Sequence, residues 1–212
     1  MAQQSLQMKQ VFIAAFWLLA FNFCFAQPVA IGKWRDHLPY NNGVAVAVAG
    51  DRIYCATTSG FFYYDTKDNS VNKLSKPEGL ADVGVNAIAY SSAYNTTILG
   101  YANGNIDLIV GDKIINFSQI LYSTVVGDKS INAILIAGDL AYLSCGFGIV
   151  VFDLAKREIK DTYKIGFNSA NIFVNDIKIY NGKIYAATKN GIYVADANSN
   201  FLNDFQQWTM LY

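Results

Sequence analysis

Residues 175–196 read Asn175-Asp-Ile-Lys-Ile-Tyr-Asn-Gly-Lys-Ile-Tyr-Ala-Ala-Thr-Lys-Asn-Gly191-Ile-Tyr-Val-Ala-Asp196 and carry the pattern from which the fold follows. Short runs rich in isoleucine, tyrosine and valine are separated by two Asn-Gly pairs. Asn-Gly is typical of a tight β-hairpin turn, because both residues tolerate a positive φ. The stretch therefore predicts three antiparallel strands joined by two short turns.

The same pattern occurs four times along the chain. A glycine of the second turn recurs at spacings of 44, 44 and 43 residues, at Gly60, Gly104, Gly148 and Gly191. A tyrosine recurs in the second strand, at Tyr54, Tyr142 and Tyr185. An aspartate recurs at the end of the third strand, at Asp65, Asp153 and Asp196. The chain is therefore built from internal repeats.

Each repeat also carries a first turn and a weaker fourth strand. The first turn is predicted at Gly50-Asp51, Gly138-Asp139 and Asn181-Gly182. The second copy, which starts at Asn86, has two extra residues in this turn, around Ser91 to Thr96. The fourth strands are predicted at 71–74, 113–117, 159–163 and 205–209.

Four antiparallel strands in 40 to 50 residues, repeated in tandem, are typical of the blades of a β-propeller. We therefore predict an all-β fold of four four-stranded antiparallel repeats. The blades are expected at about 43–80, 84–120, 130–166 and 173–212. An all-β sandwich or a solenoid is the alternative.

Residues 1–26 are predicted to be a secretory signal peptide. Lys9 gives a positive flank, residues 11–25 are almost wholly apolar, and Ala26 is a small residue before the expected cleavage. The apolar stretch is short for a membrane span of about 20 residues, so an uncleaved anchor is the alternative. After cleavage, residues 27–212 would form an exported chain with no transmembrane segment.

A lone opening strand is expected at 31–38. It contains Trp34 and resembles the end of the last repeat around Trp208. Propellers often close by adding an N-terminal strand to the last blade, which removes open sheet edges. Because the last repeat already has an outer strand, we expect an incomplete ring whose remaining blades lie beyond Tyr212. A closed four-bladed ring is the alternative.

The composition argues against several classes of function. Sixteen basic residues balance sixteen acidic ones, so the clustered positive charge of nucleic-acid-binding proteins is not expected. The one histidine, His37, has no evident nucleophile or orienting partner. Glu78 and Glu158 are the only glutamates, whereas glycosidases typically need two carboxylates that face one cleft. We therefore expect no enzyme and no catalytic, cofactor or metal residues, and the ligand-binding residues stay unknown.

Three further groups of residues have simple structural interpretations. The recurring aspartates are expected to accept hydrogen bonds within turns, and Asp196–Asn200 is interpreted as a polar turn rather than a calcium loop. Tyr63, Tyr64 and Tyr193 are expected to fill space between blades, with sugar stacking as the alternative. Cys55 and Cys145 are expected to be free thiols, with a disulfide as the alternative.

Two segments resemble known families. Glu78-Gly-Leu-Ala-Asp-Val-Gly-Val-Asn-Ala-Ile88, followed by hairpins ending in Thr-x-x-Gly, is similar to the regulator-propeller repeat of hybrid two-component regulators. The opening segment Ile31-Gly-Lys-Trp-Arg-Asp-His-Leu-Pro-Tyr-Asn41, preceded by a signal that ends in Ala-Gln, resembles the start of the PorZ family of the type IX secretion system.

The second resemblance implies a non-catalytic protein on the outer-membrane-associated cell surface. It implies association with the sortase PorU and other attachment-complex proteins, and binding of anionic lipopolysaccharide or another glycan for presentation to the sortase. A periplasmic sensor propeller of a hybrid two-component regulator is the alternative. A propeller lyase or hydrolase is less favoured, because this segment lacks the acid–base residues.

Overall fold

Four four-stranded antiparallel sheets make up residues 37–211, the part of the chain that this computed structural model describes. This part contains no α-helix, and its three 3₁₀ segments have three residues each. Each sheet is a meander in chain order, so sequence neighbours pair directly. The predicted fold class of propeller blades is confirmed.

The sixteen strands have the following bounds. The first sheet contains β1 (Gly43–Ala49), β2 (Arg52–Thr57), β3 (Phe61–Asp65) and β4 (Ser70–Leu74). The second contains β5 (Val85–Ser91), β6 (Thr96–Tyr101), β7 (Ile106–Val110) and β8 (Lys113–Phe117). The third contains β9 (Ile131–Ala137), β10 (Leu140–Cys145), β11 (Gly148–Asp153) and β12 (Glu158–Tyr163). The fourth contains β13 (Val174–Tyr180), β14 (Lys183–Thr188), β15 (Gly191–Asp196) and β16 (Thr209–Leu211).

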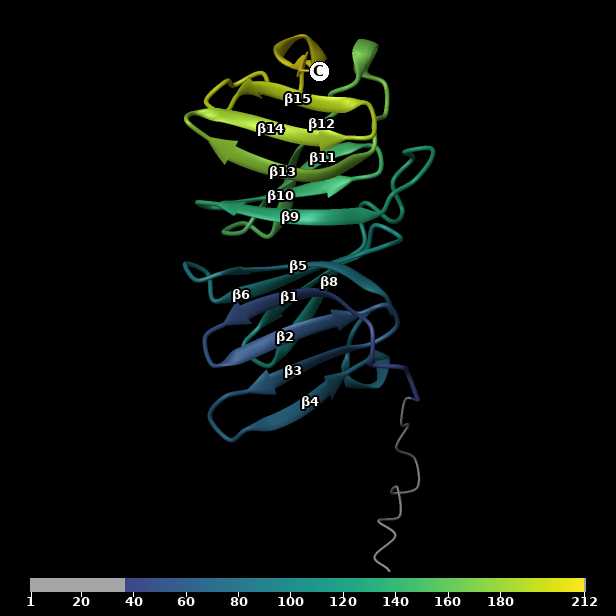
Figure 1. Cartoon of the computed structure of the whole chain (residues 1–212), viewed down its shortest axis with the longest axis vertical. Helices are drawn as coiled ribbons and strands as arrows, with labels where there is room; N and C mark the ends of the chain where they lie inside the picture. The colour runs from purple at the N-terminus through teal and green to yellow at the C-terminus, as the bar shows by residue number, and fades with distance from the viewer. Residues whose placement is uncertain (1–36, 212) are drawn as a thin grey trace, which may run out of the picture. The chain divides into compact units, whose positions relative to one another are not determined.

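The sheets pack face to face in chain order. Their first strands, β1, β5, β9 and β13, lie in contact one after another (Figure 1). Three apolar clusters fill the spaces between successive sheets. The cluster between the first two sheets contains Tyr54 and Leu99, and the one between the last two contains Tyr142 and Ile184. The facing sides of successive sheets are therefore buried because the sheets stack on one another, as expected for propeller blades.

The turns and linking segments lie at two opposite ends of the sheets. The first turns lie at one end, and the segments that lead from one sheet to the next lie at the other (Figure 1). Asn181 and Gly182 have φ values of 48° and 72°, which fits the predicted type I′ turn. Gly191 differs from that prediction, because it begins β15 with a φ of 134° and Asn190 before it has no positive φ.

The prediction for the last outer strand was wrong in its position. Residues 205–207 form a 3₁₀ turn, and the strand begins only at Thr209. Trp208, between the two, is buried, and its indole nitrogen donates a hydrogen bond to the backbone oxygen of Leu202 at 2.9 Å. Burial of this ring against the third sheet, where it lies 6.5 Å from the Tyr163 ring, decides the local backbone.

The opening strand expected at 31–38 lies mostly outside the described residues. His37 and Leu38 are described, and neither belongs to a strand. The next residues lie against the first sheet, where the Tyr40 ring meets the Phe62 ring edge-on at 6.1 Å. The predicted signal peptide at 1–26 also lies outside the described residues.

The segment from Ser75 to Gly84, which joins the first two sheets, is held by a polar network that is buried at Asp107 and Tyr101 and partly exposed at Lys76. Asp107 on β7 is fully buried and accepts hydrogen bonds from the Tyr101 hydroxyl at 2.6 Å and from the backbone nitrogen of Ala81 at 2.9 Å. The side chain of Asn103 donates to Asp82, which also pairs with Lys76 at 3.1 Å. Much of the segment that resembles the regulator-propeller repeat therefore serves to attach one blade to the next.

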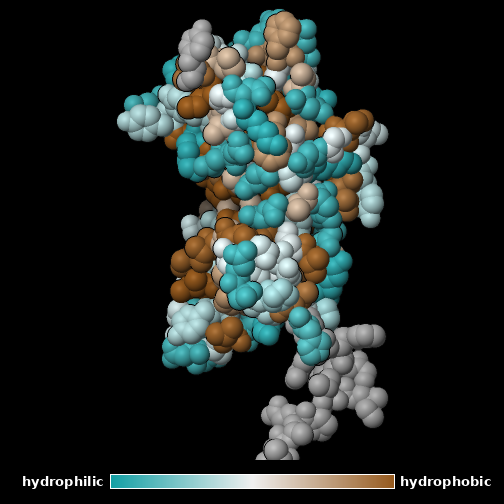
Figure 2. Space-filling view, turned by 45° about the vertical axis from the view of Figure 1, so that its right-hand side comes forward, coloured by the Kyte–Doolittle hydropathy of each residue, from teal (hydrophilic) through white to brown (hydrophobic). Residues whose placement is uncertain are grey.

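The two end sheets each leave one face uncovered within the described residues. Val46 on β1 is 66% exposed, whereas Ile177 at the same repeat position on β13 is 1% exposed. Tyr185 on β14 is half-buried, whereas its repeat equivalents Tyr54 and Tyr142 are buried against the next sheet. Hydrophobic side chains reach the surface in several separate patches between hydrophilic ones (Figure 2). The described blades therefore form an open arc, as the expected incomplete ring requires.

Candidate functional site

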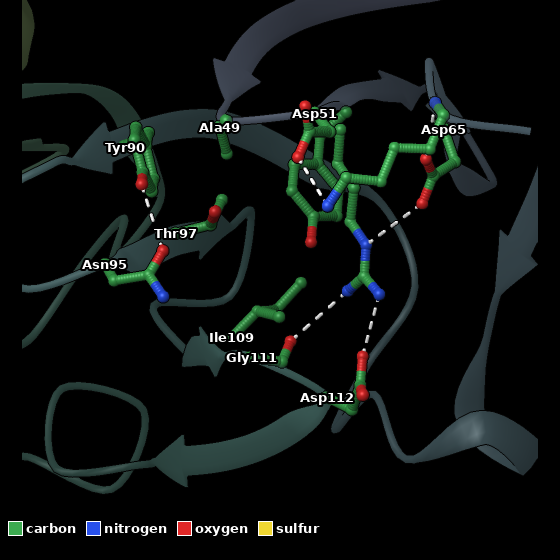
Figure 3. A pocket seen from close by; sticks show the side chains of 13 residues that line it. Ala49, Asp51, Asp65, Tyr90, Asn95, Thr97, Ile109, Gly111 and Asp112 are labelled. Atoms are coloured by element: carbon green, nitrogen blue, oxygen red, sulfur yellow. Dashed lines mark hydrogen bonds and ion pairs between the residues drawn. The ribbon is translucent and has the colours of Figure 1, made fainter.

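A cleft of about 310 Å³ lies between the first and second sheets, at the end that carries the first turns (Figure 3). Its walls come from the β1–β2 turn, from the end of β3, from the β5–β6 turn and from the β7–β8 turn. The lining residues are Ala49, Gly50, Asp51, Arg52, Tyr54, Asp65, Lys67, Tyr90, Asn95, Thr97, Ile109, Gly111 and Asp112.

Arg52 is the central side chain of this cleft. Its guanidinium donates to a carboxylate oxygen of Asp112 at 2.8 Å and to the backbone oxygen of Gly111 at 3.4 Å, across the gap between the sheets. Its Nε lies 3.7 Å from Asp65 on its own sheet. The guanidinium carbon also lies 4.7 Å from the centre of the Tyr63 ring, a cation–π contact. Arg52 therefore links the first two blades as well as lining the cleft.

The opposite wall is formed by the longer turn of the second repeat. Residues 92–95 separate β5 from β6, whereas two residues form the matching turn in the other three sheets. Asn95 adopts a φ of 45° at the end of this turn, and its side-chain oxygen accepts a hydrogen bond from Tyr90 at 3.0 Å. The two extra residues seen in the sequence thus place an amide at the mouth of the cleft.

A second cavity of about 210 Å³ shares Arg52 and Asp112 with the first. Its other walls are mainly apolar or aromatic and come from Tyr54, Tyr63, Leu74, Ile109 and Ile114, together with Gly111 and Glu78. Arg52 and Asp112 therefore lie between a polar cavity and a more apolar one.

The surroundings of Arg52 and Tyr54 shift the pKa of each away from neutral pH. The hydrogen bond to Asp112, aided by Tyr54, raises the pKa of Arg52 above its ordinary value. Burial raises the pKa of the Tyr54 hydroxyl, although the nearby Arg52 opposes the shift. Arg52 stays cationic and Tyr54 stays neutral, so the hydroxyl remains a potential hydrogen-bond donor.

The recurring aspartates act within turns, as predicted. Asp65 accepts a hydrogen bond from the backbone nitrogen of Lys67 at 3.0 Å, and Asp196 accepts one from that of Asn198 at 2.9 Å. Asp153 does the same for Lys156, three residues on, at 2.9 Å. Asp65 has a second role that the repeat pattern did not reveal, because it also faces Arg52.

The other residues singled out in the sequence do not come together at one site. His37 is exposed, Glu78 accepts a hydrogen bond from the backbone nitrogen of Ser75 at 2.9 Å, and Glu158 is paired with Lys156 at 3.8 Å on another sheet. Within residues 37–211 there is no cluster of three or more histidine, cysteine, aspartate or glutamate side chains that could hold a metal ion.

Tyr63, Tyr193 and both cysteines follow the structural predictions, whereas Tyr64 does not. Tyr63 packs against Tyr54 at 5.4 Å, and Tyr193 packs against the cluster between the last two sheets. Tyr64 points to the opposite face of the first sheet, beside the exposed Val71, where it donates a hydrogen bond to Asn69 at 2.5 Å, so it does not fill space between blades. Cys55 and Cys145 are free thiols, as predicted, and burial raises the pKa of Cys145 above its ordinary value.

Comparison with known proteins agrees with the stacked blades. The profile of the N-terminal β-propeller domain of PorZ, from the type IX secretion system, matches residues 53–209. The chain belongs to this PorZ propeller family. The match begins at Ile53 within β2 and reaches all four sheets; it includes Tyr54 of the cleft but not the β1–β2 turn or Arg52. No curated protein sequence matches the chain significantly.

Among solved structures, PorZ of Porphyromonas gingivalis is similar, with 25% sequence identity and a TM-score of 0.72. The match covers 85% of this chain and 24% of that one, so the chain spans about a quarter of its length. The extracellular domain of a protein assigned to a hybrid two-component system of B. thetaiotaomicron has 18% identity and a TM-score of 0.61. That match covers 72% of this chain and 20% of the other, and it reflects the fold alone.

The computationally designed Ika4 protein shares the blade architecture at 12% identity, with a TM-score of 0.54. The match covers 74% of this chain and 92% of the designed one. Within residues 37–211, no helix is long and apolar enough to cross a membrane.

Proposed function

We propose that the chain is the N-terminal propeller region of a PorZ-like component of the type IX secretion system. The match of the PorZ propeller profile to residues 53–209 is the observation that carries this proposal. The structural similarity to PorZ of P. gingivalis over 85% of the chain supports it. The component is exported, works at the outer-membrane-associated cell surface and is not an enzyme.

In this role the protein binds anionic lipopolysaccharide and presents it to the sortase PorU within an attachment complex. A binding role is supported by the ion pairs of the cleft, since Asp51, Asp65 and Asp112 are each engaged by Lys67 or Arg52. A general acid must be free to exchange a proton with its substrate.

The test is co-purification of the full-length protein from its native host. We expect lipopolysaccharide and the sortase to be retained with an affinity-tagged protein after washing in moderate salt. A matched exported protein with the same tag is the control. Recovery of neither lipopolysaccharide nor the sortase would overturn the proposal.

A sensor propeller of a hybrid two-component regulator is the second candidate. It is favoured by the segment from Glu78 to Ile88, which resembles the regulator-propeller repeat. The reading frame downstream of Tyr212 distinguishes the two. A membrane helix followed by a kinase would support the sensor, whereas further blades and a terminal β-sandwich would support the secretion component.

A further inference from the structure

The cleft between the first two sheets contains both donors and acceptors of hydrogen bonds. Asp112 is 87% exposed at its side chain and uses one carboxylate oxygen for Arg52. The oxygen of Asn95 accepts from Tyr90, which leaves the amide N–H₂ of this exposed residue, seen toward the cavity in Figure 3, as a donor. A ligand that both donates and accepts hydrogen bonds would match this lining.

The charges of the cleft disfavour an anion. The lining holds two cations, Arg52 and Lys67, against the carboxylates of Asp51, Asp65 and Asp112. Both cations are already paired, Arg52 with Asp112 at 2.8 Å and Lys67 with Asp51 at 2.8 Å. A phosphate or carboxylate would have to displace a paired aspartate and face the others, because like charges at close range repel.

A free cation is also poorly matched. An ammonium group in the cleft would lie near both Arg52 and Lys67, whose own carboxylate partners it would need. The lining has one more carboxylate than cations, but all three carboxylates are engaged in ion pairs, and an uncharged group leaves these pairs intact. The hydroxyls of a sugar donate and accept at once, and they can bridge an amide and a carboxylate without displacing either ion pair.

The size and shape of the cleft fit a small ligand. A volume of about 310 Å³ lies at the lower end of the range of small-molecule sites, roughly 300–1,000 Å³. Tyr90 and the buried Tyr54 line it beside the polar groups. Beyond Arg52, the more apolar second cavity could take a substituent such as an acetyl or methyl group.

We propose that this cleft binds one uncharged sugar unit of a glycan, held by Asn95, Thr97 and Asp112, and that it discriminates against phosphorylated sugars. The inference does not depend on the proposed secretion role, since it follows from the lining of the cleft. It differs from the binding of an anionic lipopolysaccharide as a whole, which would need another surface for the anionic groups.

The test uses the full chain and a panel of neutral monosaccharides, namely glucose, galactose, mannose and N-acetylglucosamine, together with their 6-phosphates. Ligand-detected NMR identifies binders, and titration gives their Kd. We expect at least one neutral sugar to bind with a Kd on the order of millimolar, as is typical of so small a ligand. We expect its 6-phosphate to bind at least fivefold more weakly. Saturable binding of no neutral sugar, or tighter binding of the phosphate, would overturn the proposal.

Two variants test whether the neutral sugar binds in the cleft. Asn95→Asp keeps the acceptor for Tyr90 but loses the amide donor, and Thr97→Val removes one hydroxyl at nearly constant shape. Each is expected to raise the Kd of the neutral sugar at least fivefold. The matched control is Lys183→Ala, because Lys183 holds the repeat position of Arg52 on the fourth sheet, outside the cleft. If the Kd of the neutral sugar is unchanged in both cleft variants, the assignment of sugar binding to this cleft is wrong.

The outcome is separable from that of the proposed function. If the full-length protein retains lipopolysaccharide and sortase while Asn95→Asp and Thr97→Val leave sugar binding unchanged, the cleft inference fails and the secretion role stands. If neutral sugars bind and the variants weaken them while neither partner is recovered, the cleft inference stands and the secretion role fails.

Discussion

At the scale of single residues, Asp82 fixes the linking segment and connects it to the second blade through Asn103. Asp82 accepts hydrogen bonds from the backbone nitrogen of Val83 at 2.9 Å and from Asn103, and it pairs with Lys76 at 3.1 Å. Burial would raise the pKa of Asp82, but these contacts outweigh it and the pKa lies below its ordinary value. The ionised form therefore stabilises the folded state.

Asp82→Asn is expected to lower the free energy of unfolding at pH 7 by about 1 kcal/mol, as one lost charge-assisted contact would. Because the folded pKa is depressed, this contribution is present above the unfolded value of about 3.9 and is lost as the pH falls through the folded pKa. Urea unfolding at pH 7 and at lower pH should therefore show a gap between the two proteins that closes in acid. Asp161→Asn is the control, because its carboxylate contacts only the backbone nitrogen of Thr162. A gap that does not change with pH would refute the assignment.

At the scale of elements, the strands follow from turn chemistry, and glycines mark where one strand passes close to another. Gly148 at the start of β11 has a φ of 146°, and a Cβ there would lie 2.3 Å from the backbone oxygen of Tyr163. Gly138 in the first turn of the same sheet has a φ of 59° and open space around it. An added Cβ would clash with the neighbouring strand only at Gly148. At Gly138 it would meet only the unfavourable backbone conformation.

Gly148→Ala is expected to destabilise the protein by more than 2 kcal/mol, because β11 and β12 would have to move apart. Gly138→Ala should cost only about 1 kcal/mol, since the left-handed conformation is its sole penalty. Thermal and urea unfolding of both variants measure the difference. Equal effects of the two substitutions would contradict the close approach at Gly148.

Element positions could be predicted wherever a local turn decides them. The strands around Asn181-Gly182 follow from the Asn-Gly pair, and the longer turn of the second copy is visible as two extra residues. The outer strand expected at 205–209 could not be placed correctly, because the burial of Trp208 depends on the neighbouring sheet.

At the scale of the whole molecule, the stacking of sheets decides which apolar side chains are covered. Val46 and Ile177 share one repeat position, yet the first faces solvent and the second is packed against the third sheet. Exposed faces of this kind are prone to association. We expect the 212-residue chain to bind a dye for exposed apolar surface and to self-associate.

Val46→Thr should reduce dye binding and change the free energy of unfolding by less than about 0.5 kcal/mol, as exposed substitutions generally do. Ile177→Thr should cost roughly 2 kcal/mol or more, because it buries a hydroxyl and leaves a gap. Dye fluorescence, sedimentation and urea unfolding measure these effects. A monodisperse wild-type chain that binds no dye would contradict the open arc.

The blades follow from the amino-acid sequence alone. The spacing of the glycines and the tight-turn pairs specify four hairpin-rich repeats, since turn geometry and strand alternation are local properties. The cleft, in contrast, exists only in the folded molecule, because Arg52 and Asp112 lie 60 positions apart and meet when two sheets stack. Arg52 occupies the repeat position that holds Thr96, Leu140 and Lys183 in the other repeats. This difference is visible in the sequence, but the sequence does not show that Arg52 binds Asp112. Pairing across sheets depends on the packing of whole faces, and that is a property of the folded chain.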